Sequence, residues 1–354
     1  MNKATWLVRG VWARVKYSLD WVFLNILVGG RFFPQLYYSI FNLSFLREHA
    51  AVLAGRRAYK KALTCHSESS VLLRRNVHRL EKGLIMRPRR TDFAKGYIMD
   101  TVIAYQSCVT NKVNNGEMKA EETEWAYDVL TEYFDVVDHS VSAIQSARDA
   151  FLRISYCSNV RGERKPYCRD LTQPPPVTYG QLLELSKLRR SVRWYKQKQV
   201  PRQIIDRALK VAAYSPSACN RQPFHFRIFD EPQKIQRVAS IPMGTAGFSH
   251  NFPGIIVLVG RLDAYFDERD RHVIYIDASL AAMSLIYALE TQGVSTCAIN
   301  WPDIGTLENK MAKELALKPY EKVIMLISYG YPDPQGQVPF SQKKPLDQIR
   351  SYNL

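Results

Sequence analysis

The chain has 354 residues, of which 46% are hydrophobic, and its formal net charge is +16. This length and composition allow two domains with a sizeable core, and they exclude a disordered or fibrous protein. Residues 1–100 hold 18 Lys and Arg against six Asp and Glu, so the other 254 residues carry only +4. A basic surface attracts polyanions, so acidic lipids, phosphorylated ligands and nucleic acid are the partner classes to weigh.

The six cysteines lie at wide, irregular spacings without a CxxC pair. Such spacing predicts neither a zinc site nor a disulfide framework, so we expect no metal and a reducing, cytoplasmic compartment. Charged residues interrupt the apolar N-terminal residues, so a cleaved signal peptide is not expected.

Residues 1–50 form an aromatic, amphipathic arm with three of the six tryptophans. Between residues 8 and 27, apolar side chains recur at steps of three and four, which predicts a helix ending at Gly29-Gly30. A second apolar run, residues 32–46, contains Pro34, and neither run reaches the roughly 20 uninterrupted residues of a spanning helix. Two interpretations stay open: an arm packed on the protein's own core or across a dimer, and a helix lying in a membrane interface.

Residues 51–160 are expected to form a helical domain. A helix is predicted from residue 67 to Gly83, with Leu73, Val77, Leu80 and Leu84 as its apolar stripe. Further amphipathic helices are predicted at 96–111, 120–137 and 140–155. Residues 161–177, with three consecutive prolines, have the composition of a linker.

From residue 178 to 354, helical and strand patterns alternate, which predicts a layered α+β domain. Helices are expected at 178–189, 201–213, 272–292 and 304–316. Strands are expected at 224–229, 254–259, 295–299 and 322–328.

Two segments of this domain contain candidate ligand-binding residues. Arg189-Arg190-Ser191-Val192-Arg193 places three guanidinium groups and a hydroxyl within five residues. That cluster suits a phosphate, although a solvated basic edge is the alternative. The second segment, residues 215–224 (SPSACNRQPF), is a loop of small and amide residues that offers backbone N–H groups to a heterocycle.

In this order and spacing, the two segments resemble the FMN-dependent nitroreductase family. Residues 277–285, 293–301 and 328–332 are similar to the family's central helix, flavin-facing strand and last core strand. The resemblance covers about residues 178–350. It implies a three-layer fold, with a central mixed sheet flanked by helices, following a mostly helical N-terminal domain.

The resemblance also implies site residues. Arg189, Arg190 and Ser191 would hold the FMN phosphate with Lys343 or Lys344, which stand where the family usually has an Arg. Arg193 would lie near the pyrimidine side of the flavin ring, where reduction places negative charge. The loop would enter the partner subunit's flavin site through Pro216, Ser217, Ala218, Asn220 and Gln222. The flavin would face the backbone of Ala298, Ile299, Asn300 and Trp301.

The resemblance implies a homodimer that uses FMN, takes hydride from NADH or NADPH and passes electrons to a second small molecule. No catalytic side chain is assigned, because the flavin does the chemistry. Asp277 is expected to support a loop or orient the central helix.

Residues 74–90 are strongly basic and resemble the long nitroreductase-like proteins found with bacterial capsule and exopolysaccharide genes. A solvated helix face, a flavin cover and an anion or substrate site stay open as interpretations. The candidate anion ligands are Arg75, His78, Arg79, Lys82, Arg87 and Arg89. No nucleic-acid reading motif is present, so specific nucleic-acid binding is not expected.

We therefore expect an FMN-dependent oxidoreductase, placed by the second resemblance in capsule or exopolysaccharide biosynthesis. It would be cytoplasmic and peripheral at the inner face of the cell membrane, held by anionic lipid at residues 1–46 and 74–90. The alternative is a flavin-binding or scaffold protein without turnover, associated with a membrane-bound polysaccharide assembly.

Overall fold

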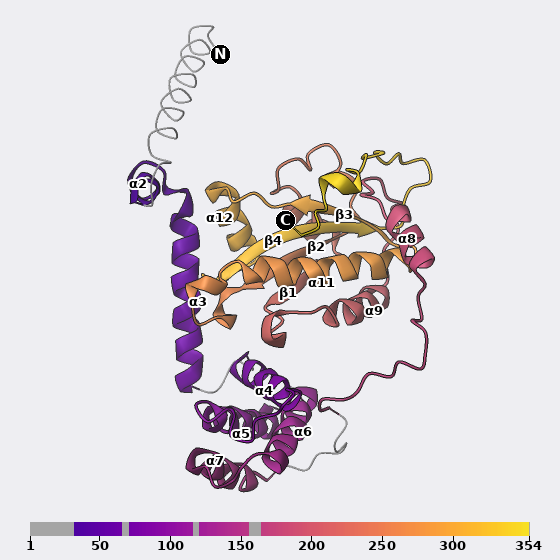
Figure 1. Cartoon of the computed structure of the whole chain (residues 1–354). Helices are drawn as coiled ribbons and strands as arrows, with labels where there is room; N and C mark the ends of the chain where they lie inside the picture. The colour runs from indigo at the N-terminus through magenta and orange to yellow at the C-terminus, as the bar shows by residue number, and fades with distance from the viewer. Residues whose placement is uncertain (1–31, 66–70, 116–119, 156–163, 354) are drawn as a thin grey trace. The chain divides into compact units, whose positions relative to one another are not determined.

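The computed structural model describes residues 32–65, 71–115, 120–155 and 164–353 (Figure 1). The chain divides into two compact units, Met1–Leu53 and Ala54–Leu354. The helix expected between residues 8 and 27 lies outside the described residues. The second apolar run forms helix α2 (Phe32–Leu36), a π-helical turn (Tyr37–Phe41) and a 3₁₀ turn (Leu43–Phe45), followed by helix α3 (Leu46–Cys65).

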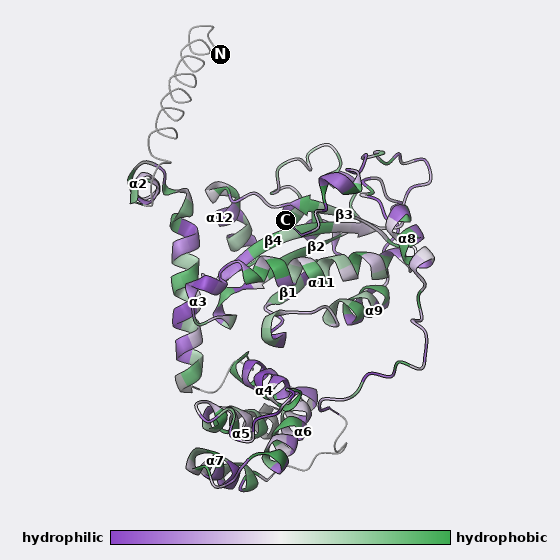
Figure 2. Ribbon diagram, in the orientation of Figure 1, coloured by the Kyte–Doolittle hydropathy of each residue, from purple (hydrophilic) through white to green (hydrophobic). Residues whose placement is uncertain are grey.

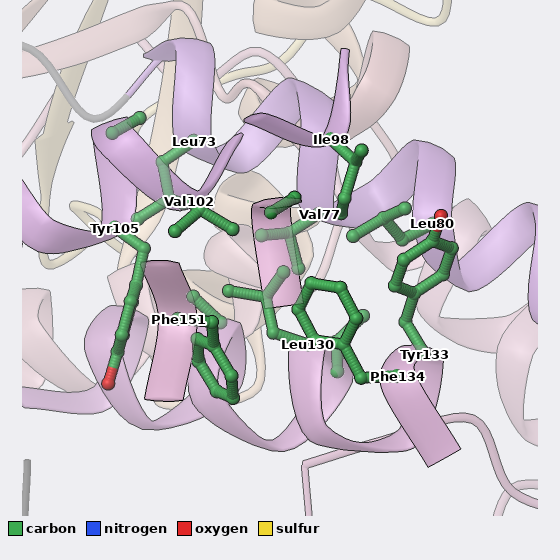
Figure 3. Close-up of a cluster of buried hydrophobic side chains, with 14 of the residues drawn as sticks. Leu73, Val77, Leu80, Ile98, Val102, Tyr105, Leu130, Tyr133, Phe134 and Phe151 are labelled. Atoms are coloured by element: carbon green, nitrogen blue, oxygen red, sulfur yellow. The ribbon is translucent and has the colours of Figure 1, made fainter. Parts of the chain in front are cut away.

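A helical domain follows, built from α4 (Val71–Leu84), α5 (Ile98–Asn115), α6 (Ala120–Val136) and α7 (Ser142–Leu152). The expected apolar stripe of α4 is buried, as predicted. Figure 3 shows Leu73, Val77 and Leu80 of this stripe packed with Tyr105, Leu130, Tyr133, Phe134 and Phe151 of the other helices. The domain therefore has a core of its own.

Residues 164–178 form no helix or strand, which agrees with the linker composition. The α+β domain after them contains α8 (Tyr179–Leu188), α9 (Arg202–Ala213), β1 (Phe224–Phe229), α10 (Pro232–Ala239), β2 (Gly254–Arg261), α11 (Val273–Glu290), β3 (Ser295–Asn300), α12 (Gly305–Glu314) and β4 (Glu321–Gly330). All the helices and strands expected after residue 178 are present. Helix α10 is an addition to them.

The four named strands form one sheet in the order β1-β2-β4-β3, with antiparallel neighbours. The parallel component of the mixed sheet is a single bridge, in which Ser191 lies against Thr296 of β3. Strand β3 is thus the edge strand, and the basic 189–193 segment runs beside it.

Helices cover both faces of the sheet. On β2, alternate residues Ile255, Val257 and Val259 share a core with residues of α10 and α12. On the other face, α11 contacts β2, β3 and β4 and packs against α9. Figure 1 shows α11 running along the sheet, and Figure 2 shows hydrophobic residues on the strands. The three-layer α+β architecture is confirmed.

Among the described residues, one helical stretch, residues 268–290, is long and apolar enough to cross a membrane by those criteria alone. Helix α11 forms most of it. Because α11 packs one face on the sheet, its place in the core explains part of its hydrophobicity.

Candidate functional site

The 189–193 segment is fixed to the sheet at the end of α8. The Val192 N–H donates to the Thr296 carbonyl at 3.0 Å. Two residues beyond the segment, the hydroxyl of buried Tyr195 donates to the Val192 carbonyl at 2.7 Å and lies 2.9 Å from Ser328 Oγ. These contacts hold the backbone of the basic segment in one position beside β3.

Arg190 has different surroundings from the other two arginines. Its guanidinium donates to the Pro339 carbonyl at 2.6 Å and to the Phe340 carbonyl. This contact brings the C-terminal tail to the basic segment, and Lys343 and Lys344 follow in that tail, both exposed. Arg190 therefore holds residues 339 and 340 of the tail at the basic segment, while the binding role of Lys343 and Lys344 stays a prediction.

Arg189 and Arg193 remain available for an anion. Burial raises the pKa of the Cys297 thiol of β3, and the nearby guanidinium groups of Arg193 and Arg189 partly offset that effect. The Arg193 guanidinium lies 5.6 Å over the Phe248 ring. Within the part of the chain that the structure describes, neither arginine forms an ion pair, although Arg189 lies close enough to the Glu290 carboxylate to influence its pKa.

The open edge of β3 supplies backbone donors. Thr296 turns its carbonyl toward Val192, and successive residues of a strand turn their backbone groups to opposite edges. Ala298 and Asn300 therefore face the same open edge as Thr296, and both are exposed. Ile299 faces β4, and the Trp301 side chain belongs to the core, which leaves Ala298 and Asn300 as the donors that fit a flavin ring.

These features match the chemistry of FMN. Two guanidinium groups without an ion pair in the described residues suit its dianionic phosphate and the negative charge of the reduced ring. Free backbone N–H groups suit the ring's polar edge. The residues of the 189–193 segment and β3 therefore fit the cofactor that the sequence implied.

The 215–222 loop has an unusual backbone. Cys219, Asn220 and Gln222 have φ angles of 53°, 50° and 49°, a region that side chains other than glycine seldom adopt. Such strain persists only where surrounding contacts impose it, and it is concentrated at functional sites. The strained backbone therefore makes the 215–222 loop a candidate part of the functional site.

Asp277 and α11 supply part of that support. The Ala218 N–H donates to Asp277 Oδ2 at 3.0 Å, and Ser215 Oγ donates to Ser284 Oγ at 2.7 Å. Burial raises the pKa of Asp277, and the Ala218 hydrogen bond opposes that rise. The expectation that Asp277 supports a loop is confirmed.

Arg74 of α4 also supports the 215–222 loop, and the sequence analysis did not assign this role to Arg74. Its guanidinium donates to the Asn220 carbonyl at 2.8 Å, to Gln222 Oε1 at 3.1 Å and to Glu122 at 2.6 Å. Helix α4 of the helical domain thus holds the loop directly. The Arg74-Arg75 pair was visible in the sequence, but its partner loop lies 146 residues later.

The loop and the 189–193 segment lie at different ends of α11. The loop contacts Asp277 near the start of the helix. Burial raises the pKa of Glu290 at the other end, and Arg189 lies close enough to oppose that rise. Thirteen residues of helix separate the two carboxylates, about 20 Å at 1.5 Å per residue, so one chain does not bring the two groups together.

The six candidate anion ligands of the helical domain separate into three sets. Arg75 and Arg79 line one cavity. His78 lies 3.2 Å from Glu81 and lines a second hollow, with Arg74 and the 215–222 loop. Lys82, Arg87 and Arg89 are exposed and line neither. The six side chains therefore do not line one common cavity, and their anion-binding role stays a prediction.

No group of His, Cys, Asp and Glu side chains in the described ranges could hold a metal ion.

Comparisons with known proteins agree with this geometry. The family model described as "Nitroreductase family" matches residues 187–247 and 242–331. Iodotyrosine deiodinase 1 of Pongo abelii is 25% identical over 194 residues, covering 47% of this chain and 66% of that relative. A putative NADH dehydrogenase/NAD(P)H nitroreductase of Methanothermobacter thermautotrophicus is 24% identical, covering 44% of this chain and 80% of the relative.

A solved FMN-dependent nitroreductase from Clostridium difficile R20291 is 24% identical, covering 49% of this chain and 99% of its own, with a TM-score of 0.42. The chain spans about two thirds of the length of the first deiodinase relative. The family match falls on the basic segment, the loop and all four strands of the sheet. Residues 187–331 of the chain are therefore similar to the nitroreductase family.

Proposed function

We propose that the protein is an FMN-dependent oxidoreductase that oxidises NADH or NADPH and reduces a small organic molecule. The observation that carries the proposal is the pair of guanidinium groups, Arg189 and Arg193, that form no ion pair in the described residues and lie beside the open edge of β3. When bound, FMN accepts a hydride from the nicotinamide and passes it, or its two electrons, to the second substrate.

The protein's own groups would bind the cofactor and orient it. Arg189 would pair with the phosphate dianion, and Arg193 would favour negative charge on the pyrimidine side of the ring. Ala298 and Asn300 would donate their N–H groups to the ring and fix its plane against β3. Hydride arrival needs no protein base, so no side chain is assigned that role.

The active form is proposed to be a homodimer. The loop and the 189–193 segment lie at different ends of α11, so a complete site would combine one group from each copy. Helix α11 also exposes an apolar stripe, formed by Tyr275, Ile276, Leu280 and Met283. A second copy of the chain would cover that stripe, as large exposed apolar patches of soluble proteins are usually covered.

Reductive dehalogenation of an aromatic ring is a second candidate for the reaction. Iodotyrosine deiodinases are among the relatives, at 22–26% identity. In such a reaction, two electrons and a proton replace a carbon–halogen bond by a carbon–hydrogen bond, and a halide ion leaves. The electrons would come from NADH or NADPH through the same flavin, so the two candidates differ only in the acceptor.

The visible absorption spectrum tests the proposed function. The purified full-length protein should show the two bands of oxidised flavin, which anaerobic NADH or NADPH should bleach. A nitrophenol, an iodophenol and a quinone, added separately, should then identify the acceptor class by restoring the bands. A protein that stays colourless after incubation with FMN, or a bound flavin that neither nicotinamide bleaches, would refute the proposal.

Membrane association through residues 1–46 and 74–90 stays a prediction, because residues 1–31 lie outside the described part. The deiodinase and nitroreductase relatives have no bearing on polysaccharide assembly, so the polysaccharide context also stays a prediction.

A further inference from the structure

The helical domain contains a cavity of about 1150 Å³ that the flavin site does not use. The second half of α3, α4, the start of α5 and residues 90–97 line it, together with Phe266 and Asp267. Its cationic side chains are Arg56, Lys60, Arg75, Arg79, Arg90 and Lys95. Only three carboxylates, from Asp92, Asp100 and Asp267, share the lining. The cavity is therefore positively charged.

Two of its arginines lack an acidic partner. Arg79 lies 3.6 Å over the Tyr97 ring, and its nearest hydrogen-bond partner is Asn76 Oδ1 at 3.5 Å. Arg75 lies 4.8 Å over the Phe266 ring and 3.4 Å from the Tyr59 hydroxyl. Across the described ranges neither forms an ion pair, whereas Arg74, next to Arg75 in α4, pairs with Glu122 at 2.6 Å.

The lack of an ion pair at Arg75 and Arg79 in the described residues indicates that the cavity binds an anion. A partly buried cation without a counter-ion is unfavourable, so it is usually paired or used for binding. Stacking on an aromatic ring fixes the plane of a guanidinium and leaves its N–H edge free for a planar or tetrahedral oxyanion. Arg56 and Lys95 are already paired, with Glu268 at 2.8 Å and Asp92 at 2.7 Å. Lys60 and Arg90 are exposed, so Arg75 and Arg79 are the partly buried cations that could hold the ligand.

The walls are built by close packing. A Cβ atom on Gly83 would lie 2.2 Å from the Phe93 ring, so this glycine lets Phe93 pack directly on α4. A Cβ atom on Gly55 would lie 2.7 Å from Leu262, so α3 also packs closely against the segment before Phe266. The arginines thus project from a fixed frame, which lowers the entropy lost on binding.

We propose that this cavity binds a small organic phosphate, with Arg75 and Arg79 on the phosphate group. Guanidinium groups match phosphate oxygens in charge and geometry. The volume exceeds what an inorganic ion fills, and Leu63, Leu72 and Ile103 give the cavity an apolar wall for an organic part. The site is separate from the flavin site and makes the helical domain a ligand-binding domain.

Isothermal titration calorimetry on the flavin-loaded, full-length protein tests the proposal, with ADP, pyrophosphate and inorganic phosphate as probes. ADP or pyrophosphate should bind more tightly than inorganic phosphate, and Arg75→Gln/Arg79→Gln should weaken that binding at least tenfold. Lys82→Gln, on the exposed side of the same helix, should leave the affinity unchanged. The double variant should keep its visible flavin spectrum, which shows that it is folded and that the flavin site is intact.

Vesicle co-sedimentation distinguishes a soluble phosphate from a lipid headgroup. Vesicles of phosphatidylcholine with and without phosphatidic acid should bind wild type and the double variant equally. The proposal is overturned if none of the three probes binds, if the double variant binds ADP and pyrophosphate as well as wild type, or if only the phosphatidic acid vesicles distinguish the two proteins.

Discussion

Three arginines within five residues have different surroundings at the start of the α+β domain. Arg190 is held by two carbonyls of the C-terminal tail, whereas Arg189 and Arg193 lie beside β3 without an ion-pair partner in the described ranges. An arginine that is already hydrogen-bonded within the protein has fewer free N–H groups to donate to a cofactor. We therefore expect Arg189 and Arg193 to dominate cofactor binding.

Replacing both, in Arg189→Ala/Arg193→Ala, should give a folded protein that purifies without colour. Each hydrogen bond to a charged group contributes about 1.5–3 kcal/mol, so FMN affinity should fall at least a hundredfold, as measured by flavin fluorescence. Lys234→Ala/Arg237→Ala, which removes two cations from α10, is the matched control and should retain the flavin. Stoichiometric FMN in the first variant would disprove the assignment.

A second residue-scale prediction concerns pH. The hydrogen bond from Arg202 lowers the pKa of Asp230 below its ordinary 3.8, through contacts of 2.6 and 3.0 Å. A carboxylate with a lowered folded-state pKa stabilises the fold above its unfolded-state pKa, and the contribution disappears as pH falls through the folded-state value. Arg202 is largely exposed, so solvent screens the pair and its contribution to stability is small.

Arg202→Ala should lower the free energy of unfolding slightly at neutral pH. In urea denaturation, the difference between variant and wild type should stay constant down to about pH 5 and shrink below pH 4. A difference that does not change with pH would show that the lost packing of the arginine stem matters, not its charge.

Individual elements show what the sequence could predict. The stripe of α4 is local, so its periodicity alone identified Leu73, Val77, Leu80 and Leu84 as core residues. The strands were found by their β-branched runs, with bounds within two residues. Helix α10 has only eight residues, or about two turns, too few for a helical period to stand out.

Contacts between distant elements were not predictable in the same way. No periodicity connects Arg74 with Asn220, or Arg79 with Tyr97, because those pairs depend on how the folded elements pack. Family resemblance identified the loop and the basic segment. It said nothing about the helical domain that holds the loop.

Among the helices, α4 should lose stability when Gly83 is replaced by a residue with a side chain. In Gly83→Ala the new methyl group would meet the Phe93 ring at 2.2 Å, so the ring and residues 90–97 must move. Overpacking of this kind costs about 1–3 kcal/mol, and thermal unfolding should show it. Gly96→Ala is the control, because a Cβ atom there has nothing within 4 Å. Equal melting temperatures for the two variants would contradict the packing argument.

Arg74→Ala should release the loop from α4. Three polar contacts are lost, and the left-handed backbone at Cys219, Asn220 and Gln222 loses support. FMN binding should therefore weaken about tenfold or more, while the far-ultraviolet circular dichroism spectrum stays unchanged. Lys82→Ala, on the same helix, should behave as wild type. Wild-type flavin affinity in Arg74→Ala would show that the loop does not need this contact.

For the whole molecule, the central claim is that a flavin binds between two copies of the chain. The claim rests on the separation of the loop and the basic segment along α11 and on the exposed apolar stripe of that helix. A dimer of this kind has two sites, each using the 189–193 segment of one copy and the loop of the other.

Flavin content of a mixed dimer tests this claim most directly. Differently tagged Arg189→Ala/Arg193→Ala and Asn220→Ala chains would be produced together and the heterodimer isolated by both tags. Each homodimer should lack flavin, because both of its sites are damaged. The heterodimer should bind one FMN, because one site carries every lesion and the other carries none. A heterodimer without flavin, or a flavin-loaded wild-type monomer in light scattering, would contradict the account.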